Sequence, residues 1–458
     1  MKKHSFFSKV MPTIGLALAT SVGAQDINFA GSLTSQFGFG LPNAHKNKGD
    51  FLLGQTIFDG SIKSFYEESM VYVNAQIVHD ALGSQSSNGH SGFVSDDGSI
   101  ALKLREAYID WKGGIFALRI GRQIVSWGKA DDIQITDIIS PKDESGAIAT
   151  DYNESRLGID AVRLSILLDQ AQFDAYFIPF FTPSILPLSK GNPLRSHLFP
   201  DSYDGITINS PKDYTDFERP KNRFSNSEYA LRASVYTSIA DLSLYGFYGW
   251  EDTPFIRYVP TLNDESDEDL DIKDISITGK YKRTTMIGAD AAIPAGDFVF
   301  RLEVAFFPRR HFQTTSDFQI RQMMNGGKAS SSLLKYQTLS LAGFDWTPSE
   351  GWTITAQYIS DFVCNHDNDI DRKNYLHQAT LSIEKTLLNE TLTISASGAM
   401  DLRAFSTTSE LEIDYKLSDA ITLSLIGDLN LEGPNGREGL FGEYRDFSSV
   451  TFKGKMSF

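Results

Sequence analysis

The sequence has 458 residues, with 42 Lys and Arg against 58 Asp and Glu, so its formal charge is −16 at pH 7. An acidic chain lacks the clustered Lys and Arg that phosphate binding needs, which argues against nucleic acid as a partner. The one cysteine, Cys364, excludes an intrachain disulfide, so a small disulfide-stapled scaffold is excluded as well. After the first segment no apolar run approaches the length of a membrane-spanning helix. Such a chain enters a membrane only as a closed β-barrel, because every backbone donor and acceptor in hydrocarbon must be paired within the protein.

The first segment has the features of a secretory signal peptide. A basic start is followed by an apolar stretch around Met11–Ala19 and by small residues that end at Ala24, where we expect cleavage. The alternative, a retained membrane anchor, conflicts with an apolar stretch well short of the ~20 residues that span a bilayer. We therefore predict a signal peptide over residues 1–24 and one folded domain over residues 25–458.

Alternation of apolar and polar residues predicts about 18 β-strands along the chain. Short turns are predicted near residues 66–67, 113–114, 169–170, 239–240, 294–296, 348–351, 388–389 and 417–419. Longer connections are predicted at about residues 40–53, 80–100, 127–155, 182–227, 252–280, 308–333, 363–373, 402–405 and 431–445. Short and long connections take turns, which is typical of outer-membrane barrels with short periplasmic turns and long outer loops.

The predicted fold class is therefore all-β, a transmembrane antiparallel β-barrel of about 18 strands. A chain that starts and ends in the periplasm needs an even number of strands, so 18 fits, and 16 stays open through loss of the first strand pair. A soluble β-sandwich or propeller gives no reason for the long loops to gather at one end.

Residues 101–143 show the hairpin plan most clearly. Two segments with apolar residues at alternate positions flank Gly113 and Gly114. Glycine takes the positive φ that both central residues of a tight hairpin turn need. With these glycines as the turn, Lys112 pairs with Ile115, and the pairing of the whole hairpin follows.

The predicted pairing gives this hairpin one apolar and one polar face. The apolar face contains the pairs Trp111/Phe116, Ile109/Leu118 and Ala107/Ile120. The polar face contains the pairs Asp110/Ala117, Tyr108/Arg119 and Glu106/Gly121. In a membrane barrel the apolar face contacts lipid and the polar face lines a wet interior. A soluble sandwich would bury the apolar face instead, and this pattern alone does not choose between them.

The hairpin and the loop after it resemble a known family. The segments LREAYIDW (104–111), LRIGRQIVSWGKAD (118–131) and TDIISPKD (136–143) are similar to a signature of bacterial outer-membrane β-barrels that are classed as a domain of unknown function and are loosely similar to alginate-export porins. The resemblance covers about Leu104–Asp143, and elsewhere only the general barrel pattern is matched. It implies an outer-membrane channel and supplies no catalytic residues.

The chain ends on an amphipathic strand in which apolar and polar residues alternate from Val450 to Phe458. A strand of this kind that stops on Phe458 resembles the signal by which the barrel-assembly machinery recognises outer-membrane proteins. We therefore expect that machinery as a partner, together with outer-membrane lipid and lipopolysaccharide. The alternative is a soluble secreted β-protein that ends in phenylalanine by chance.

Aromatic residues near strand ends suggest girdles at the membrane interfaces, where an amphipathic ring sits between lipid and headgroups. The residues that carry this suggestion are Tyr229, Tyr236, Tyr245, Phe247, Tyr248, Trp250, Trp111, Trp346 and Trp352. Ordinary β-propensity of aromatic residues is the alternative for any one of them.

The loop at residues 125–155 mixes charged residues with isoleucines, for example Ile133, Ile135 and Ile138, and is too apolar for a purely solvated loop. We predict that it folds partly into the barrel lumen and places charges across the channel as a constriction. The alternative is an extracellular cap of the same composition. The predicted lumen and constriction residues are Glu106, Tyr108, Asp110, Arg119, Arg122, Gln123, Lys129, Asp131, Asp132, Asp137, Lys142 and Asp143.

Arg105 and Arg122 conflict with the predicted faces. In the predicted pairing they oppose each other on the lipid side, where an arginine near the bilayer midplane costs ~2–4 kcal/mol. Either they reach the phosphates of the outer leaflet, or a bulge beyond Gly121 turns Arg122 inward beside Glu106. We favour the bulge, because Gly121 supplies the glycine that a bulge needs.

Two acidic stretches, residues 263–274 and 367–371, could bind divalent cations. Neither has the spacing of a helix-loop-helix calcium site, and in the second Arg372 occupies the place of the sharp-turn glycine. We predict solvated loop tips in both. Cys364 and His366 offer only two of the three or four ligands that zinc needs, so no metal or cofactor site is predicted.

No enzymatic motif stands out, because the eight histidines fall in no recognisable setting with a nucleophile and an orienting group. The sequence therefore predicts a passive, water-filled channel for small solutes and no enzyme. Charges of both signs are present in the expected lumen, so the preferred sign of solute is not predicted. The alternatives are a surface receptor or adhesin whose long loops bind a ligand, and an exporter of polysaccharide by analogy with alginate exporters.

Overall fold

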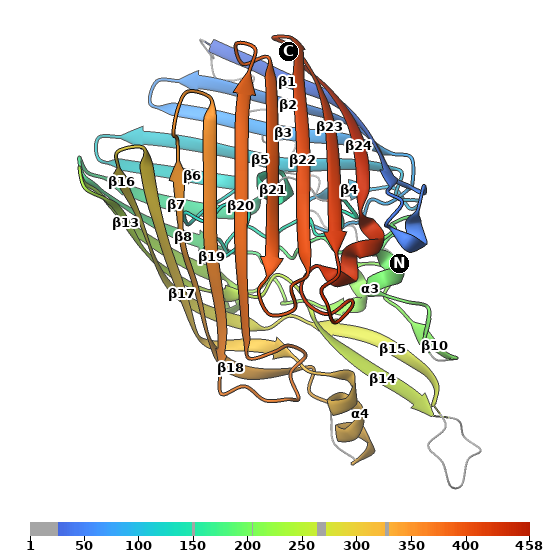
Figure 1. Cartoon of the computed structure of the whole chain (residues 1–458). Helices are drawn as coiled ribbons and strands as arrows, with labels where there is room; N and C mark the ends of the chain where they lie inside the picture. Colours follow the sequence, from blue (N-terminus) through green and yellow to red (C-terminus); the bar gives the residue numbers. More distant parts are fainter. Residues whose placement is uncertain (1–25, 149–151, 204, 263–271, 326–328) are drawn as a thin grey trace.

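The computed structural model describes residues 26–148, 152–203, 205–262, 272–325 and 329–458, so the predicted signal peptide lies outside the described residues. Within the described ranges, 18 strands form one closed antiparallel barrel (Figure 1). Each barrel strand pairs with the next one along the chain, and β24 pairs with β1 to close the ring. The predicted fold class and strand number are confirmed.

The barrel strands follow one another along the chain. They are β1 (Asp26–Gly40), β2 (Phe51–Tyr66), β3 (Ser69–Asp80), β5 (Ile100–Gly113), β6 (Phe116–Gln123), β7 (Ile159–Leu167), β8 (Ala171–Ile178), β12 (Glu228–Tyr236), β13 (Asp241–Trp250), β16 (Arg283–Ala295), β17 (Phe298–Gln313), β18 (Ser332–Trp346), β19 (Trp352–Cys364), β20 (Tyr375–Leu387), β21 (Leu392–Asp401), β22 (Thr407–Ser418), β23 (Ile421–Leu431) and β24 (Ser449–Ser457). Short turns join them at one end and long loops at the other, as predicted (Figure 1).

Some of the long loops carry secondary structure of their own. A separate five-stranded sheet contains β9 (Ser202–Tyr203), β10 (Ile206–Asn209), β11 (Phe217–Glu218), β14 (Phe255–Leu262) and β15 (Ile272–Lys280), and β4 (Gly92–Val94) pairs beside β5. The helical segments are η1 (His45–Asn47), α2 (Tyr152–Ser155), α3 (Arg195–Leu198), η2 (Tyr214–Asp216), η3 (Phe224–Asn226), α4 (Ser316–Met324) and η4 (Gly442–Phe447). In the described part of the chain, none of the helices is both long enough and apolar enough to cross a membrane.

Strand β14 lies at the edge of the small sheet, and glutamine side chains cover part of its free backbone. The Ile256 N–H donates to Gln313 Oε1 at 2.8 Å, and Gln313 Nε2 donates to the Ile256 carbonyl at 2.8 Å. The Tyr258 N–H donates to Gln319 Oε1 at 3.1 Å. Backbone groups that a sheet leaves open at its edge are therefore satisfied here by side chains.

Strand β17 shows how the barrel wall separates its two faces. Leu302, Val304 and Phe306 are 40–48% exposed, whereas Glu303 and Ala305 between them are at most 3% exposed. Alternate side chains of a strand point to opposite faces, so the exposed apolar set points out of the barrel. This outward apolar face is the one that lipid contacts.

The central hairpin forms between β5 and β6, but its turn lies one residue further along than predicted. Trp111 pairs with Leu118 rather than with Phe116, and the turn residues are Gly114 and Ile115. Gly114 has a φ of 58°, and a turn with glycine at its first central position needs only that one positive φ. The pairing shifts by two residues, and an even shift keeps every side chain on its predicted face.

The predicted bulge also lies elsewhere. Two successive residues of β3 pair with Glu106 and Leu104 of β5, so the extra residue is Arg105 and the bulge is not beyond Gly121. The extra residue changes the alternation of the strand. Arg105 thereby reaches the carbonyl oxygen of Glu154, to which its Nη1 donates at 2.7 Å.

Arg122 does not lie beside Glu106, which corrects the second half of that prediction. It forms an ion pair with Asp160 on β7, with Nε and Oδ1 3.0 Å apart, and Nη1 donates to the carbonyl oxygen of His90. An acidic partner and cover from the loop that contains His90 keep this arginine away from hydrocarbon, so no inward turn of β6 is needed.

The aromatic girdle prediction is wrong for two residues of β13 and stays a prediction for the outward-facing aromatic residues of β12 and β13. Tyr229 and Tyr248 are exposed on the outer face. Tyr245 and Phe247 are buried, because they occupy the alternate positions that face into the barrel. An aromatic residue in a strand therefore marks a lipid interface only when its position in the alternation points outward.

The end of β24 packs against the first strand. The Phe458 N–H donates to the Gly31 carbonyl oxygen, and the Gly31 N–H donates to the Phe458 carbonyl oxygen, both at 2.9 Å. The Phe458 ring stacks on Phe29 with ring centroids 5.9 Å apart. Recognition of this terminus by the barrel-assembly machinery stays a prediction.

Candidate functional site

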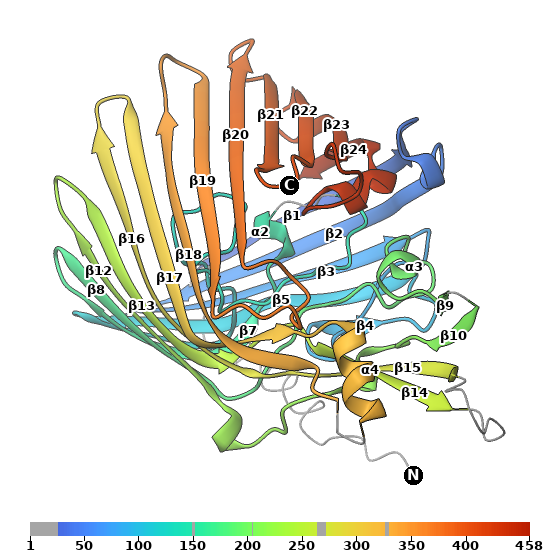
Figure 2. The same ribbon diagram turned by 60° about the horizontal axis from the view of Figure 1, so that its bottom comes forward.

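The segment between β6 and β7, residues 124–158, is here called the inner loop, because it lies against the inner face of the barrel wall. Figure 2 shows α2, which belongs to this loop, within the ring of strands. Five of its buried apolar side chains are Val125, Trp127, Ile135, Ile138 and Ile139. They form one cluster with the inward-facing residues Ile159, Ala161, Tyr176, Ile178, Ala230, Tyr245, Phe247, Met286, Ala305, Phe307, Leu339, Leu341 and Ile359. We call the inner faces of β7, β8, β12, β13 and β16–β19, which carry these residues, the covered wall.

One buried carboxylate of the covered wall accepts four hydrogen bonds from the inner loop. Glu303 Oε2 accepts from the N–H groups of Lys129 at 2.7 Å and Ala130 at 2.9 Å. Its Oε1 accepts from the Thr136 N–H at 2.8 Å and the Thr136 hydroxyl at 2.6 Å. A carboxylate that accepts several N–H bonds stays compensated although it is buried. Glu303 thus fixes both sides of the loop tip to β17.

The tip between these contacts is held by two further wall residues. Arg301 Nη1 donates to Asp131 Oδ2 at 2.7 Å and to the Lys129 carbonyl oxygen at 3.0 Å. Gln357 of β19 accepts from the Asp131 N–H and donates to the Asp131 carbonyl oxygen, both at 3.1 Å. The next residue, Asp132, has a φ of 57°. The chain therefore reverses at Asp132, immediately after the residue that β17 and β19 hold.

The middle of the inner loop is braced by its own buried ion pair. Asp137 Oδ2 lies 2.6 Å from Arg156 Nη2, and Asp137 Oδ1 accepts from the Trp127 N–H at 2.9 Å. The Tyr152 hydroxyl donates to Asp137 at 3.2 Å. Lys142 lies over the Tyr152 ring, with Nζ 3.7 Å from the centroid. Breaking one partner of a buried pair leaves an uncompensated charge, so these contacts favour one conformation of the loop.

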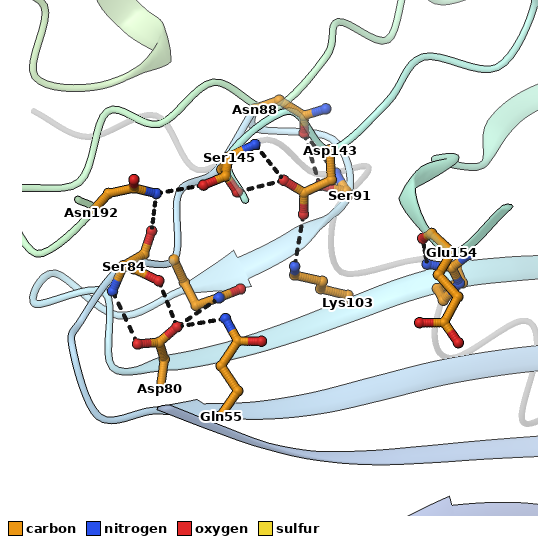
Figure 3. A network of polar contacts seen from close by, with 12 residues as sticks. Gln55, Asp80, Ser84, Asn88, Ser91, Lys103, Asp143, Ser145, Glu154 and Asn192 are labelled. Carbon is orange, nitrogen blue, oxygen red and sulfur yellow. Dashed lines mark hydrogen bonds and ion pairs between the residues drawn. The ribbon is translucent and has the colours of Figure 1, made fainter. Parts of the chain in front are cut away.

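Asp143 ties the loop to β5, which lies outside the covered wall. Lys103 of β5 lies 2.9 Å from Asp143 Oδ2, and the Ser145 N–H and hydroxyl donate to Asp143 Oδ1 (Figure 3). Burial opposes ionisation of Asp143, but the Lys103 ammonium and the Ser145 hydrogen bonds outweigh it and lower the pKa of the carboxyl. Asp143 is therefore a charged link at neutral pH.

The same network joins three outer loops. Asn192 Nδ2 donates to the Ser145 carbonyl oxygen at 2.7 Å and to the Ser84 carbonyl oxygen at 3.2 Å (Figure 3). The Ser84 hydroxyl donates to Asp80 at 2.6 Å, and Gln55 Nε2 donates to Asp80 at 2.8 Å. The end of the inner loop is therefore held by the loops that follow β3 and β8.

The inner faces of β20–β24 and β1–β5 carry a different set of side chains, and we call them the open wall. Glu410 and Asp428 lie directly opposite each other on β22 and β23. Glu412 pairs with Lys453 of β24, with Oε1 and Nζ 3.0 Å apart. Asp132 at the loop tip lies close enough to Glu410 to act on it electrostatically. The loop tip and the open wall thus face each other with acidic groups.

The predicted residues of the hairpin lie on its inward face and are paired. Glu106 Oε1 accepts from the Ile124 N–H at 2.9 Å, at the point where the inner loop begins. Arg119 pairs with Asp110 and lies over the Tyr108 ring at 4.1 Å from its centroid. Gln123 is fully buried and donates to the Ala161 carbonyl oxygen at 3.1 Å. A role of these residues in solute passage stays a prediction.

The wall residues that hold the loop were missed by the sequence analysis. Glu303, Arg301 and Gln357 are more than 150 residues away in sequence from the loop atoms that they bind, for example 174 residues for Glu303 and Lys129. Glu303 and Arg301 carry one usable signal, because they are charged residues at alternate positions among the apolar residues of the segment 298–307.

The two acidic stretches show no metal site in the described ranges. Asp369 pairs with Arg321 at 2.8 Å, and Asp367 lies 3.9 Å from Lys335. Residues 263–271 of the other stretch lie outside the described residues. Among the residues that the structure describes, no three His, Cys, Asp or Glu side chains are grouped so that they could hold a metal ion.

Comparisons with known proteins agree with this fold. A family model described as "Protein of unknown function (DUF1302)" matches residues 43–417. A search of curated proteins found no match. Among solved structures, OccAB4 of Acinetobacter baumannii is 9% identical with a TM-score of 0.51, over 95% of this chain and 99% of that chain. OccK2 (OpdF) of Pseudomonas aeruginosa is 10% identical with a TM-score of 0.50, over 95% and 98%. At these identities the likeness shows the fold alone.

Proposed function

The chain belongs to the DUF1302 family of unknown function, and we propose that it is a passive diffusion channel for small solutes, narrowed by the inner loop. The protein is located in the bacterial outer membrane. A closed barrel with an apolar outer face satisfies its backbone internally and contacts lipid on that face. A barrel of 18 strands leaves an aqueous passage unless something narrows it.

The attachment of the inner loop to Glu303 is the observation that carries this proposal. The loop is bound to the covered wall through Glu303, Arg301 and Gln357, and its apolar side chains are buried there. A loop fixed in this way would narrow the lumen, and we place the remaining passage beside the polar side chains of the open wall. Solutes would pass between the loop tip and β20–β24.

The charges along this passage favour cations over anions. Strands β22–β24 contribute Glu410, Glu412 and Asp428 together with Lys453, and the loop adds Asp132. Lys453 is already paired with Glu412, so the remaining carboxyls set the potential. In a narrow passage with low-dielectric walls, one sign of charge raises the local concentration of the opposite ion.

Reconstitution of the purified, folded protein in planar bilayers tests the proposal. We expect stepwise conductance and, across a KCl gradient, a reversal potential of the sign that K⁺ permeation produces. Resistance of the folded barrel to unfolding in cold detergent on a gel is the control for folding. Repeated electrical silence from folded protein would refute the channel and favour a surface receptor.

A further inference from the structure

A cavity lies between the inner loop, the loop after β8, the start of the loop after β13 and strand β17. Its volume is about 90 Å³, which is room for a few water molecules or one small headgroup. Carboxyl groups and aromatic rings share its lining, namely Glu144, Glu251, Asp252, Phe247, Trp250 and Phe307. It sits at the loop end of the barrel, between the inner loop and the covered wall.

The charges around this cavity do not cancel. Glu251 is neutralised by Arg310, whose Nε and Nη2 each lie 3.0 Å from a carboxylate oxygen. Glu144 accepts a 3.3 Å hydrogen bond from the Ser184 hydroxyl, but that bond brings no charge. Lys142 acts on both Glu144 and Asp252. One ammonium group thus faces two carboxyls.

A buried hydroxyl in the same lining lacks a partner. Thr284 is 4% exposed, and its Oγ1 makes no hydrogen bond to the residues that the structure describes. Buried polar side chains are nearly always hydrogen-bonded, so an exception in a cavity wall points to a partner that occupies the cavity. A hydroxyl oxygen can accept from an N–H donor as well as donate.

The carboxyls of Glu144 and Asp252 are also buried away from water. Burial raises the pKa of the Glu144 carboxyl, and burial together with Glu228, Glu251 and Glu144 raises the pKa of Asp252 well above its usual range. Removal from water penalises the charged form unless an opposite charge is close. A cation in the cavity would supply that charge.

We propose that this cavity binds the ammonium group of a primary amine. Two carboxyls supply the charge, Thr284 accepts one N–H, and Phe247, Phe307 and Trp250 line the cavity with apolar surface for the alkyl group. A hydrated metal ion gains nothing from such rings, because Mg²⁺ and Ca²⁺ take oxygen ligands. The inference deepens the proposed function: it makes amine-bearing solutes a class that the channel captures at its outer mouth.

The test is calorimetric titration of the full-length protein in detergent with ethylammonium chloride. We expect saturable binding of ethylammonium and none of ethanol or of NaCl at matched ionic strength. In the double variant Glu144→Gln/Asp252→Asn the saturable heat should disappear, and in Thr284→Val the affinity should fall severalfold. Glu443→Gln is the matched control, because that carboxylate is exposed on another loop and its loss should change nothing.

Two results would overturn the inference: binding of ethanol equal to that of ethylammonium, or saturable ethylammonium binding that survives in the double variant. Mobility of the folded barrel on a gel shows whether a variant has folded, and Thr284→Val, which removes no charge, keeps the test decisive if the double variant does not fold. Calorimetry measures binding to protein in detergent and needs no conductance. Failure of the channel proposal and failure of the amine-binding proposal can therefore be told apart.

Discussion

The covered wall and the open wall belong to one barrel, yet their inner faces differ in chemistry. The covered wall is apolar inside, with Phe247, Met286, Ala305 and Leu341 buried under the inner loop and with the carboxylate of Glu303 among them. The inner faces of β22–β24 instead bear the carboxyls of Glu410, Glu412 and Asp428 and the ammonium group of Lys453. An apolar residue at an inward-facing position therefore indicates that protein, rather than water, covers that part of the barrel wall.

This difference also explains how an acidic residue is tolerated in the covered wall. Glu303 accepts hydrogen bonds from backbone N–H groups and a hydroxyl of the loop, so the loop solvates it in place of water. On the open wall Asp428 accepts from the Ser449 hydroxyl and Glu412 pairs with Lys453, so strand residues rather than a loop are the partners of these carboxyls. The same residue type thus holds a loop on one side of the lumen, and on the other side we propose that it attracts cations.

Removal of the Glu303 carboxylate should have the largest effect on the difference between the covered wall and the open wall. Glu303→Ala leaves three backbone N–H groups and the Thr136 hydroxyl without their acceptor, and each buried unsatisfied group costs ~1–3 kcal/mol. The loop tip should leave the wall, with a marked rise and greater noise in single-channel conductance. Glu443→Gln, on an exposed loop, should leave the conductance unchanged. A Glu303→Ala channel that conducts like the wild type would contradict the proposed constriction.

The next largest effect should come from truncating Trp127, because this substitution leaves a new cavity under the inner loop. Trp127 packs on Tyr245 with ring centroids 4.8 Å apart and is buried in the covered wall. Trp127→Ala should cost ~3–5 kcal/mol of loop packing and allow protease cleavage within the inner loop. Trp111→Ala on the lipid-facing side is the matched control, and equal protease sensitivity of the two variants would argue against the buried position of the loop.

The pH dependence of stability should report on Lys142. Burial lowers its pKa to about 8, while Asp137, Glu144 and Asp252 raise it and Arg156 lowers it. Between pH 8 and the ordinary lysine range of ~10.4, the unfolded chain holds a proton that the folded chain has lost, so stability should rise with pH in this window. Melting temperatures of wild type and Lys142→Met from pH 7.5 to 10.5 measure it. Parallel curves would show that Lys142 titrates normally.

Charge changes on the open wall should have the smallest effect and the most specific one. Glu410→Gln and Glu412→Gln each remove one carboxyl from the passage, so the reversal potential in a KCl gradient should move toward zero while the conductance changes little. Asp297→Asn, at a turn on the opposite end of the barrel, is the control. A shift of equal size in Asp297→Asn would remove the basis for placing selectivity at β22.

Much of the fold could be predicted from the sequence, because alternation and turn chemistry are local. Strand number, the segregation of long loops and the faces of the central hairpin follow from residues a few positions apart. The exact pairing failed at Gly113 and Gly114, since one glycine suffices for the turn and two were present. The bulge at Arg105 failed as well, because its position depends on how β3 pairs with β5.

The site was predictable in one half only. The charged and apolar residues of the inner loop, such as Asp131 and Asp137, stand out in the sequence as a loop too apolar for solvent. The partners of that loop do not, because Glu303 and Gln357 lie on β17 and β19, whose approach to the loop is set by closure of the whole barrel. Residues far apart in sequence meet here for reasons that no local pattern records.

The hydrogen bonds of Gln313 and Gln319 to strand β14 affect how the protein can associate with neighbouring molecules at the cell surface. Sheet edges invite strands of neighbouring molecules to add to them, and β14 extends from the mouth of the barrel where such neighbours are abundant. Gln313 and Gln319 occupy the backbone positions of Ile256 and Tyr258 that an incoming strand would use. The side-chain amides of two glutamines thereby disfavour aggregation through the addition of a strand at this edge.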